Sequence, residues 1–153
     1  MACELIQREF SVPDSEEKVL VGVRQLSASA ALALHLELVG KVGGAIFPFI
    51  QNNYKFGDII HFMRQAEAGV MTELMKRVVC YATLDGKEVK PATYDMHYNG
   101  KMMLACQVFA FVCEANYLDF FKQGLEINAQ RQLEEAEASK LAEQKNSGPV
   151  EKT

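Results

Sequence analysis

Tryptophan is absent from this chain of 153 residues, which has only four prolines and four cysteines. The densest apolar stretch, MMLACQVFAFVC at 102–113, contains Gln107 and is closed by Glu114. A helix that spans a bilayer needs roughly 20 predominantly apolar residues. The first ten residues, MACELIQREF, have no apolar core of the kind that a secretory signal requires. We therefore expect a cytosolic protein that does not insert into a membrane.

An excess of positive charge is missing too. The chain has 16 Lys and Arg residues against 20 Asp and Glu, so its formal net charge is -4. A surface that binds a phosphate backbone needs clustered Lys and Arg. We therefore expect no nucleic acid among the partners.

The cysteines do not predict disulfides. They are Cys3, Cys80, Cys106 and Cys113. The chain is long and apolar enough to fold without disulfide bonds. On one helix, Cys106 and Cys113 would lie roughly 10 Å apart, beyond the roughly 7 Å limit for a disulfide. We interpret the cysteines as reduced and as small buried hydrophobic residues.

Motifs of catalysis and of metal binding are missing as well. His35, His61 and His97 lie on different predicted elements, and none belongs to an H-E-x-x-H or C-x-x-C pattern. The GKVGG run at 40–44 lacks the spacing of a phosphate-binding loop. His35 and Glu37 do not share a helix face, so we interpret both as solvated polar positions. The sequence predicts no enzyme activity, no metal and no cofactor.

What the chain does contain predicts a mainly α fold with a small antiparallel β element, formed by an N-terminal strand and a short hairpin. The stretch KVLVGVRQL at 18–26 alternates and is rich in β-branched residues, as strands are. Asp85-Gly86 is the best hairpin turn signal in the chain and lies between short strand-like runs. The N-terminal strand could pair with this hairpin in a small antiparallel sheet.

The segment SASAALALHLELVGKVGG, at 27–44, fits two templates. Its leucines alternate from Leu32 to Leu38 as they would in a strand, whereas Ala and Leu are strong helix formers. Ser27 is a suitable N-cap, and the glycines at the end of the segment suit a helix terminus. We predict a helix.

Residues 56–84 contain a second helical region. Asp58 is the expected N-cap, and Ile59 and Phe62 belong to the inner face. Gly69 marks the expected break. The pattern predicts either one interrupted helix or two helices.

The most apolar helix is predicted at 99–128. Leu104, Val108 and Phe111 belong to one stripe at helical spacing, and a second apolar set covers the adjacent face. Such a helix must be covered on most sides, either by its own domain or by a partner.

The composition turns polar after Leu125, where large apolar residues become rare. We expect a single helical globular domain over residues 1–128 and a charged tail over 129–153. The tail should be helical from Gln130 to Lys145 and disordered beyond Asn146.

Three segments carry a resemblance. They are VRQLSASAALALHLELVGKVGGAI at 23–46, HYNGKMMLACQVFAFVCEANYLDFF at 97–121, and the hairpin-like linker between them. Together they resemble the tail assembly chaperones of long-tailed bacteriophages. The SAS tract at 27–29 departs from the family pattern, which has a proline-containing turn there.

The resemblance implies a chaperone that binds and shields the apolar, helical tape-measure protein during tail morphogenesis and is released as tube subunits polymerise. It implies action in the host cell cytoplasm and absence from the mature virion. The tape-measure protein would be the main partner, and the tail tube protein is a second candidate. The alternative is a structural or scaffold protein of the virion or tail that self-associates through its apolar C-terminal helix.

In this picture, a groove lined by methionine and aromatic residues would hold the partner, because such side chains give adaptable apolar surfaces that bind helices. The candidate contact residues are Met63, Met71, Met102, Phe109, Tyr117, Phe120 and Phe121. The alternative is that all seven belong to the hydrophobic core.

Overall fold

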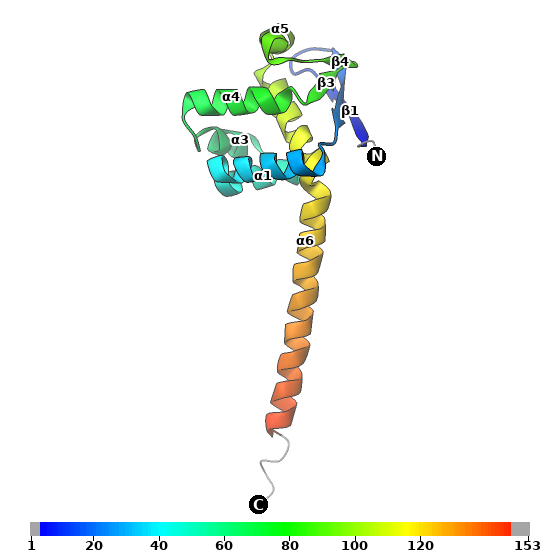
Figure 1. The fold of residues 1–153 in the computed structure, drawn as a ribbon, viewed down its shortest axis with the longest axis vertical. Coiled ribbons are helices and arrows are strands. Elements are labelled where there is room, and N and C mark those ends of the chain that lie inside the picture. The colour runs from blue at the N-terminus through cyan, green and yellow to red at the C-terminus, as the bar shows by residue number, and fades with distance from the viewer. Residues whose placement is uncertain (1–3, 148–153) are drawn as a thin grey trace, which may run out of the picture. The chain divides into compact units, whose positions relative to one another are not determined.

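The computed structural model describes the backbone of residues 4–147 and the side chains of residues 4–144 (Figure 1). Its strands are β1 (Leu5–Ser11), β2 (Lys18–Arg24), β3 (Ala82–Leu84) and β4 (Lys87–Glu88). Its α-helices are α1 (Ala28–Val42), α2 (Phe47–Ile50), α3 (Phe56–Met63), α4 (Ala68–Val79), α5 (Tyr94–Tyr98) and α6 (Met102–Ser147), and two short 3-10 helices span Gly43–Ile46 and Pro91–Thr93. This mainly helical architecture with a small antiparallel sheet confirms the predicted fold class.

The chain divides into two compact units, one ending at Leu118 and the other beginning at Asp119. The boundary expected between 128 and 129 stays a prediction. In the second unit the helix predicted from Gln130 to Lys145 is present. The disorder expected beyond Asn146 falls mainly on residues 148–153, which lie outside the described residues, as does Cys3.

The sheet has the order β1-β2-β3-β4, and each neighbouring pair is antiparallel. On β2, Val21 and Val23 are fully buried, and Val21 lies opposite Leu84 of β3. The β3-β4 turn has positive φ angles of 51° at Asp85 and 80° at Gly86, as a tight type I′ hairpin requires. The predicted strand, the hairpin and their pairing are therefore confirmed.

Strand β1 was not predicted from the sequence. Ile6, Arg8 and Phe10 share one face of β1, because side chains alternate along a strand. The guanidinium of Arg8 lies 4.6 Å from the ring centroid of Phe111 and donates bonds of 2.8 and 3.0 Å to the carboxylate of Glu114. Because a charged residue lies on the inward face of β1, the alternation of apolar and polar residues that predicts a strand is interrupted there.

Helix α1 begins where predicted. The hydroxyl of Ser27 accepts a hydrogen bond of 3.4 Å from the backbone N–H of Ala30, and the helix ends at Gly43, whose φ of 58° is the left-handed conformation that glycine allows. The helical interpretation of 27–44 is confirmed.

The second helical region consists of two helices, α3 and α4, but two residue assignments within it were wrong. The N-cap of α3 is Lys55, and Asp58 lies three residues further on, where its carboxylate accepts a bond of 2.8 Å from the Lys55 N–H. The break falls between Met63 and Ala68. Gly69 lies within the first turn of α4 and not in the break.

The first part of α6 forms the centre of the core. From 104 to 113 every residue except Gln107 is buried. The ring centroid of Phe109 lies 5.8 Å from that of Phe49 and 5.0 Å from that of Phe62. Figure 1 shows α1, α3 and α4 on one side of this part of α6 and the strands on the other. Residues 104–113 of the predicted apolar helix are therefore covered by their own domain, whereas Met102, Phe120 and Leu125 are exposed.

Polar residues that follow this apolar stretch bond to the N-terminal third of the chain. Asn116 accepts a bond of 2.9 Å from the backbone N–H of Leu26, and the hydroxyl of Tyr117 donates one of 2.8 Å to the carbonyl of Ala31. Together with the pair of Glu114 and Arg8, these bonds tie β1, the β2-α1 connection and α1 to α6.

Replacing Phe109 by Ala should lower the free energy of unfolding by about 3–5 kcal/mol, because it leaves a cavity in the core. The matched control is Phe120→Ala in the second unit, where the side chain is 62% exposed and the expected change is within about 0.5 kcal/mol. Urea unfolding followed by circular dichroism measures both. Equal losses of stability in the two variants would contradict this assignment of core and surface.

Candidate functional site

A groove lined by methionines lies in the first unit and has a volume of about 280 Å³. Its lining comes from the end of α3, the first two thirds of α4, α5 and the start of α6: Met63, Ala68, Met71, Thr72, Met75, Tyr94, Met102, Ala105 and Cys106. The volume falls just below the roughly 300–1,000 Å³ of pockets that hold small molecules. The groove therefore suits a few apolar side chains of a partner better than a metabolite.

The helical period brings these residues together. Met71 and Met75 are four residues apart on α4, and Met102 and Cys106 are four apart on α6, so each pair shares one helix face. Tyr94 is stacked on Tyr98 with ring centroids 5.1 Å apart. The groove thus combines flexible methionines with an anchored aromatic ring.

Exposure changes steeply from the floor of the groove to its rim. Met71 is 6% exposed, whereas Met102 is 72% exposed. None of the described residues that line the groove is charged, and burial raises the pKa of the Cys106 thiol. A cation, Lys76, lies close by, with its ammonium 5.7 Å from the ring centroid of Tyr94, and the lining itself is suited to apolar side chains.

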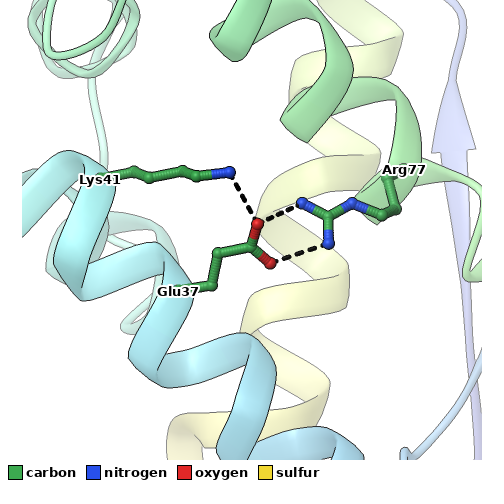
Figure 2. A network of polar contacts seen from close by, with 3 residues as sticks. All are labelled: Glu37, Lys41 and Arg77. Atoms are coloured by element: carbon green, nitrogen blue, oxygen red, sulfur yellow. Dashed lines mark hydrogen bonds and ion pairs between the residues drawn. The ribbon is translucent and has the colours of Figure 1, made fainter.

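An ion-pair network positions α4, which contributes the floor of the groove. Figure 2 shows the carboxylate of Glu37 on α1 between Arg77 of α4 and Lys41. The two Arg77 bonds are 2.8 and 2.6 Å long, and the Lys41 bond is 2.7 Å long. The Arg77 and Lys41 bonds hold the pKa of Glu37 at about 2. The interpretation of Glu37 as a merely solvated residue was wrong, because sequence spacing within α1 does not reveal a partner on α4.

Residues 19–129 match a family model described as phage tail assembly chaperone protein, TAC. The chain belongs to this family. No curated protein and no solved structure matches it. Tail assembly chaperones act on tail proteins during phage assembly in the host cell, and chaperones of this kind generally act by binding rather than by catalysis.

Three of the seven predicted contact residues of this tail assembly chaperone come together in the groove. Met63, Met71 and Met102 line it from three different helices. Met75 and Tyr94 were not among the predicted contact residues, although the four-residue spacing of Met75 from Met71 is a signal that could have identified Met75.

The other four candidates lie elsewhere. Phe109 is fully buried, and Tyr117 is 4% exposed with its ring centroid 5.2 Å from that of His35. Phe120 and Phe121 belong to the second unit, where their ring centroids lie 5.6 Å apart. The contacts of Phe109 and Tyr117 are those of core residues, whereas Phe120 is accessible to a partner.

A larger hollow of the chaperone, with a volume of about 880 Å³, lies beside the sheet. It passes over Gly22 of β2, and charged residues such as Arg24, Glu88 and Lys90 line it. Its mixed lining is less suited to an apolar partner than the methionine groove. Among the described residues, no group of three or more His, Cys, Asp or Glu could hold a metal ion.

Replacing Glu37 by Gln should lower the free energy of unfolding at neutral pH by about 1 kcal/mol, because it removes the ion pairs with Arg77 and Lys41. Since the folded-state pKa of Glu37 is lowered, this stabilisation is present above its ordinary value of 4.5 and is lost as the pH falls toward 2. Urea unfolding across this range measures the difference between the two proteins.

The control for this pH dependence is Glu9→Gln, which removes an exposed pair of 3.6 Å with Lys18. This variant should unfold like the wild type at every pH. A difference between wild type and Glu37→Gln that stays constant down to pH 2 would contradict the role of the Glu37 carboxylate.

Proposed function

We propose that this tail assembly chaperone binds the apolar, helical tape-measure protein and shields it until the tail tube forms around it. The observation that carries the proposal is the open methionine groove, which has an apolar floor, an exposed rim at Met102 and no charged residue in its described lining. Methionine side chains adapt to partners of different shape, so the groove can accept successive positions along one client helix.

The small volume of the groove favours binding of a few client side chains over enclosure of a whole client helix. A groove of about 280 Å³ has room for a few large apolar side chains, such as those that repeat along one face of a helix. Several copies of the chaperone would then cover a long client. Each copy binds weakly, so polymerising tube subunits can displace it one site at a time.

The second unit supplies further exposed apolar residues, among them Phe120, Leu125 and Leu133. We include Phe120 and Phe121 in the proposed client surface, with the tail tube protein as the second candidate partner. The alternative of self-association through the apolar C-terminal helix has less support, because residues 104–113 of that helix are largely buried in their own domain.

Replacing Met102 by Glu should reduce the amount of tape-measure protein that stays soluble and co-purifies with the chaperone at least tenfold, because it places a charge beside a lining whose described residues are all uncharged. The matched control is Met96→Glu, since Met96 is 74% exposed and lies outside the groove, whereas Met102 is 72% exposed. Co-expression, affinity purification and quantitative mass spectrometry measure the captured client.

Both variants should keep the wild-type circular dichroism spectrum and unfolding midpoint, because both positions are exposed. Equal loss of the client in Met96→Glu and Met102→Glu would disprove the groove as the binding site. Capture of no tape-measure protein by the wild type would disprove the proposed function itself.

A further inference from the structure

Strand β1 lies at one end of the sheet order β1-β2-β3-β4, and all seven of its residues are exposed or half-buried. In the part of the chain that the structure describes, β2 pairs with one edge of β1 and no strand pairs with the other. An unpaired edge carries a row of backbone N–H and C=O groups that bind an extended segment of another chain. The free edge of β1 is therefore a surface on which a further strand can add.

The register of β1 and β2 shows which backbone groups are free. At one end of the ladder, the carbonyl of Glu4 accepts a bond of 2.9 Å from the N–H of Gln25. At the other end, the N–H of Val12 donates a bond of 2.9 Å to the carbonyl of Glu17. Bonded and non-bonded pairs alternate in an antiparallel ladder, so the even-numbered residues of β1 bond to β2. The backbone groups that point away from β2 belong to the odd-numbered residues Leu5, Gln7, Glu9 and Ser11.

A hollow of about 330 Å³ lies beside the second half of this edge. It is lined from β1, the α2-α3 connection and α6 by Arg8, Glu9, Phe10, Ser11, Asn52, Tyr54, Gln107 and Phe111. Residues from both faces of β1 line it, but none of the described residues of β2 does, so the hollow opens at the edge that faces away from β2. The ring of Tyr54 is stacked on that of buried Phe49, with centroids 5.0 Å apart, which anchors one wall.

Gln107 adds a second, independent observation. Its Oε1 atom is buried and has no hydrogen-bond partner among the described residues. Buried acceptors are rarely left unpaired in folded proteins, because an unpaired acceptor loses its bond to water without gaining another. Since Gln107 lines the hollow, an N–H or O–H donor that enters the hollow would satisfy this atom.

We propose that an extended segment of a partner protein adds to the free edge of β1 and extends the four-stranded sheet. Its backbone pairs with the free N–H and C=O groups of Gln7, Glu9 and Ser11. Every second side chain of the segment points inward, next to Arg8, and enters the hollow. One of these side chains is threonine, asparagine or glutamine, which donates a hydrogen bond to Gln107 Oε1.

Charge sets the remaining chemistry of the segment. Arg8 is already neutralised by two bonds to Glu114, so a carboxylate in the hollow gains little from it. Its inward-pointing charge also protects the edge from indiscriminate apolar strands. Glu9 points to the outer face, where its pair with Lys18 is exposed and 3.6 Å long. A lysine or arginine of the added strand opposite Glu9 is favoured, because opposite charges stabilise neighbouring strands.

This surface is separate from the proposed client site, because none of the described residues that line the methionine groove lines the hollow. Its occupant also differs in conformation, since the edge of a sheet binds an extended backbone and the groove suits a helix. Failure of one proposal therefore leaves the other standing.

The test uses the isotope-labelled full chain and a synthetic nine-residue peptide in which threonine and asparagine alternate with valine and lysine. Amide hydrogen exchange measured by NMR reports each backbone N–H by itself. In the free protein the N–H groups of Gln7, Glu9 and Ser11 should exchange rapidly, whereas those of Ile6 and Arg8 are protected by β2. Saturation with the peptide should slow exchange of the three free N–H groups at least tenfold.

Ser11→Pro is the decisive variant. Proline has no N–H, and the N–H of Ser11 points away from β2, so the β1-β2 ladder stays intact while the affinity for the peptide should fall at least tenfold. The matched control is Glu88→Pro, which removes an outward N–H from the opposite edge of the sheet, next to the bonded turn pair of Leu84 and Lys87. This variant should bind the peptide like the wild type.

Gln107→Leu separates binding from folding. It should bind the peptide several-fold more weakly, because the acceptor in the hollow is lost. Its unfolding midpoint should be no lower than that of the wild type, because the substitution removes a buried atom that has no partner in the described chain.

Three results would overturn the proposal. The first is unchanged exchange of the free-edge N–H groups at millimolar peptide. The second is peptide binding that Ser11→Pro retains, which would make the hollow a pocket for isolated side chains rather than part of a strand-binding edge. The third is protection of these N–H groups that rises with protein concentration when no peptide is present, which would make the edge an interface between copies of the chain.

Discussion

Burial of the first part of α6 is the constraint on which the rest of the domain depends. The ring of Phe109 packs against Phe49 and Phe62. The polar residues Glu114, Asn116 and Tyr117, which follow it on α6, bond to Arg8, Leu26 and Ala31 of three preceding segments. The EANY tetrapeptide at 114–117 is thus both a mark of the family resemblance and the point where the N-terminal elements are fastened to α6. Its polar side chains have bonding partners within the fold itself.

Because residues 104–113 of α6 are largely buried inside the domain, the proposed partner surface lies where apolar groups stay uncovered. One such place is the methionine groove, where buried Met71 and exposed Met102 belong to the same cluster. The outer side of α1 also exposes large apolar side chains. The ion pairs of Glu37 with Arg77 and Lys41 hold α1 to α4, which contributes the floor of the groove.

Local patterns predicted the elements well where residues three or four apart, or neighbours in a turn, decide the conformation. The α1 helix with its Ser27 cap and the Asp85-Gly86 turn are of this kind. One failure has a long-range cause and the other a local one. Strand β1 was missed because Arg8 faces inward and is stabilised by Glu114, which lies 106 residues away. The position of the α3 cap was missed because Asp58 also suits the third position of a helix.

The sequence by itself determined the helical fold class, the hairpin, the apolar helix of the family motif and the wealth of methionine. Only the tertiary structure decided which apolar residues face the core and which face solvent. Periodicity shows which side chains share a helix face, but not what that face meets. The leucines of α1 are the clearest case, since their alternation in sequence places them on both sides of the helix, and the packing of the domain covers only one side.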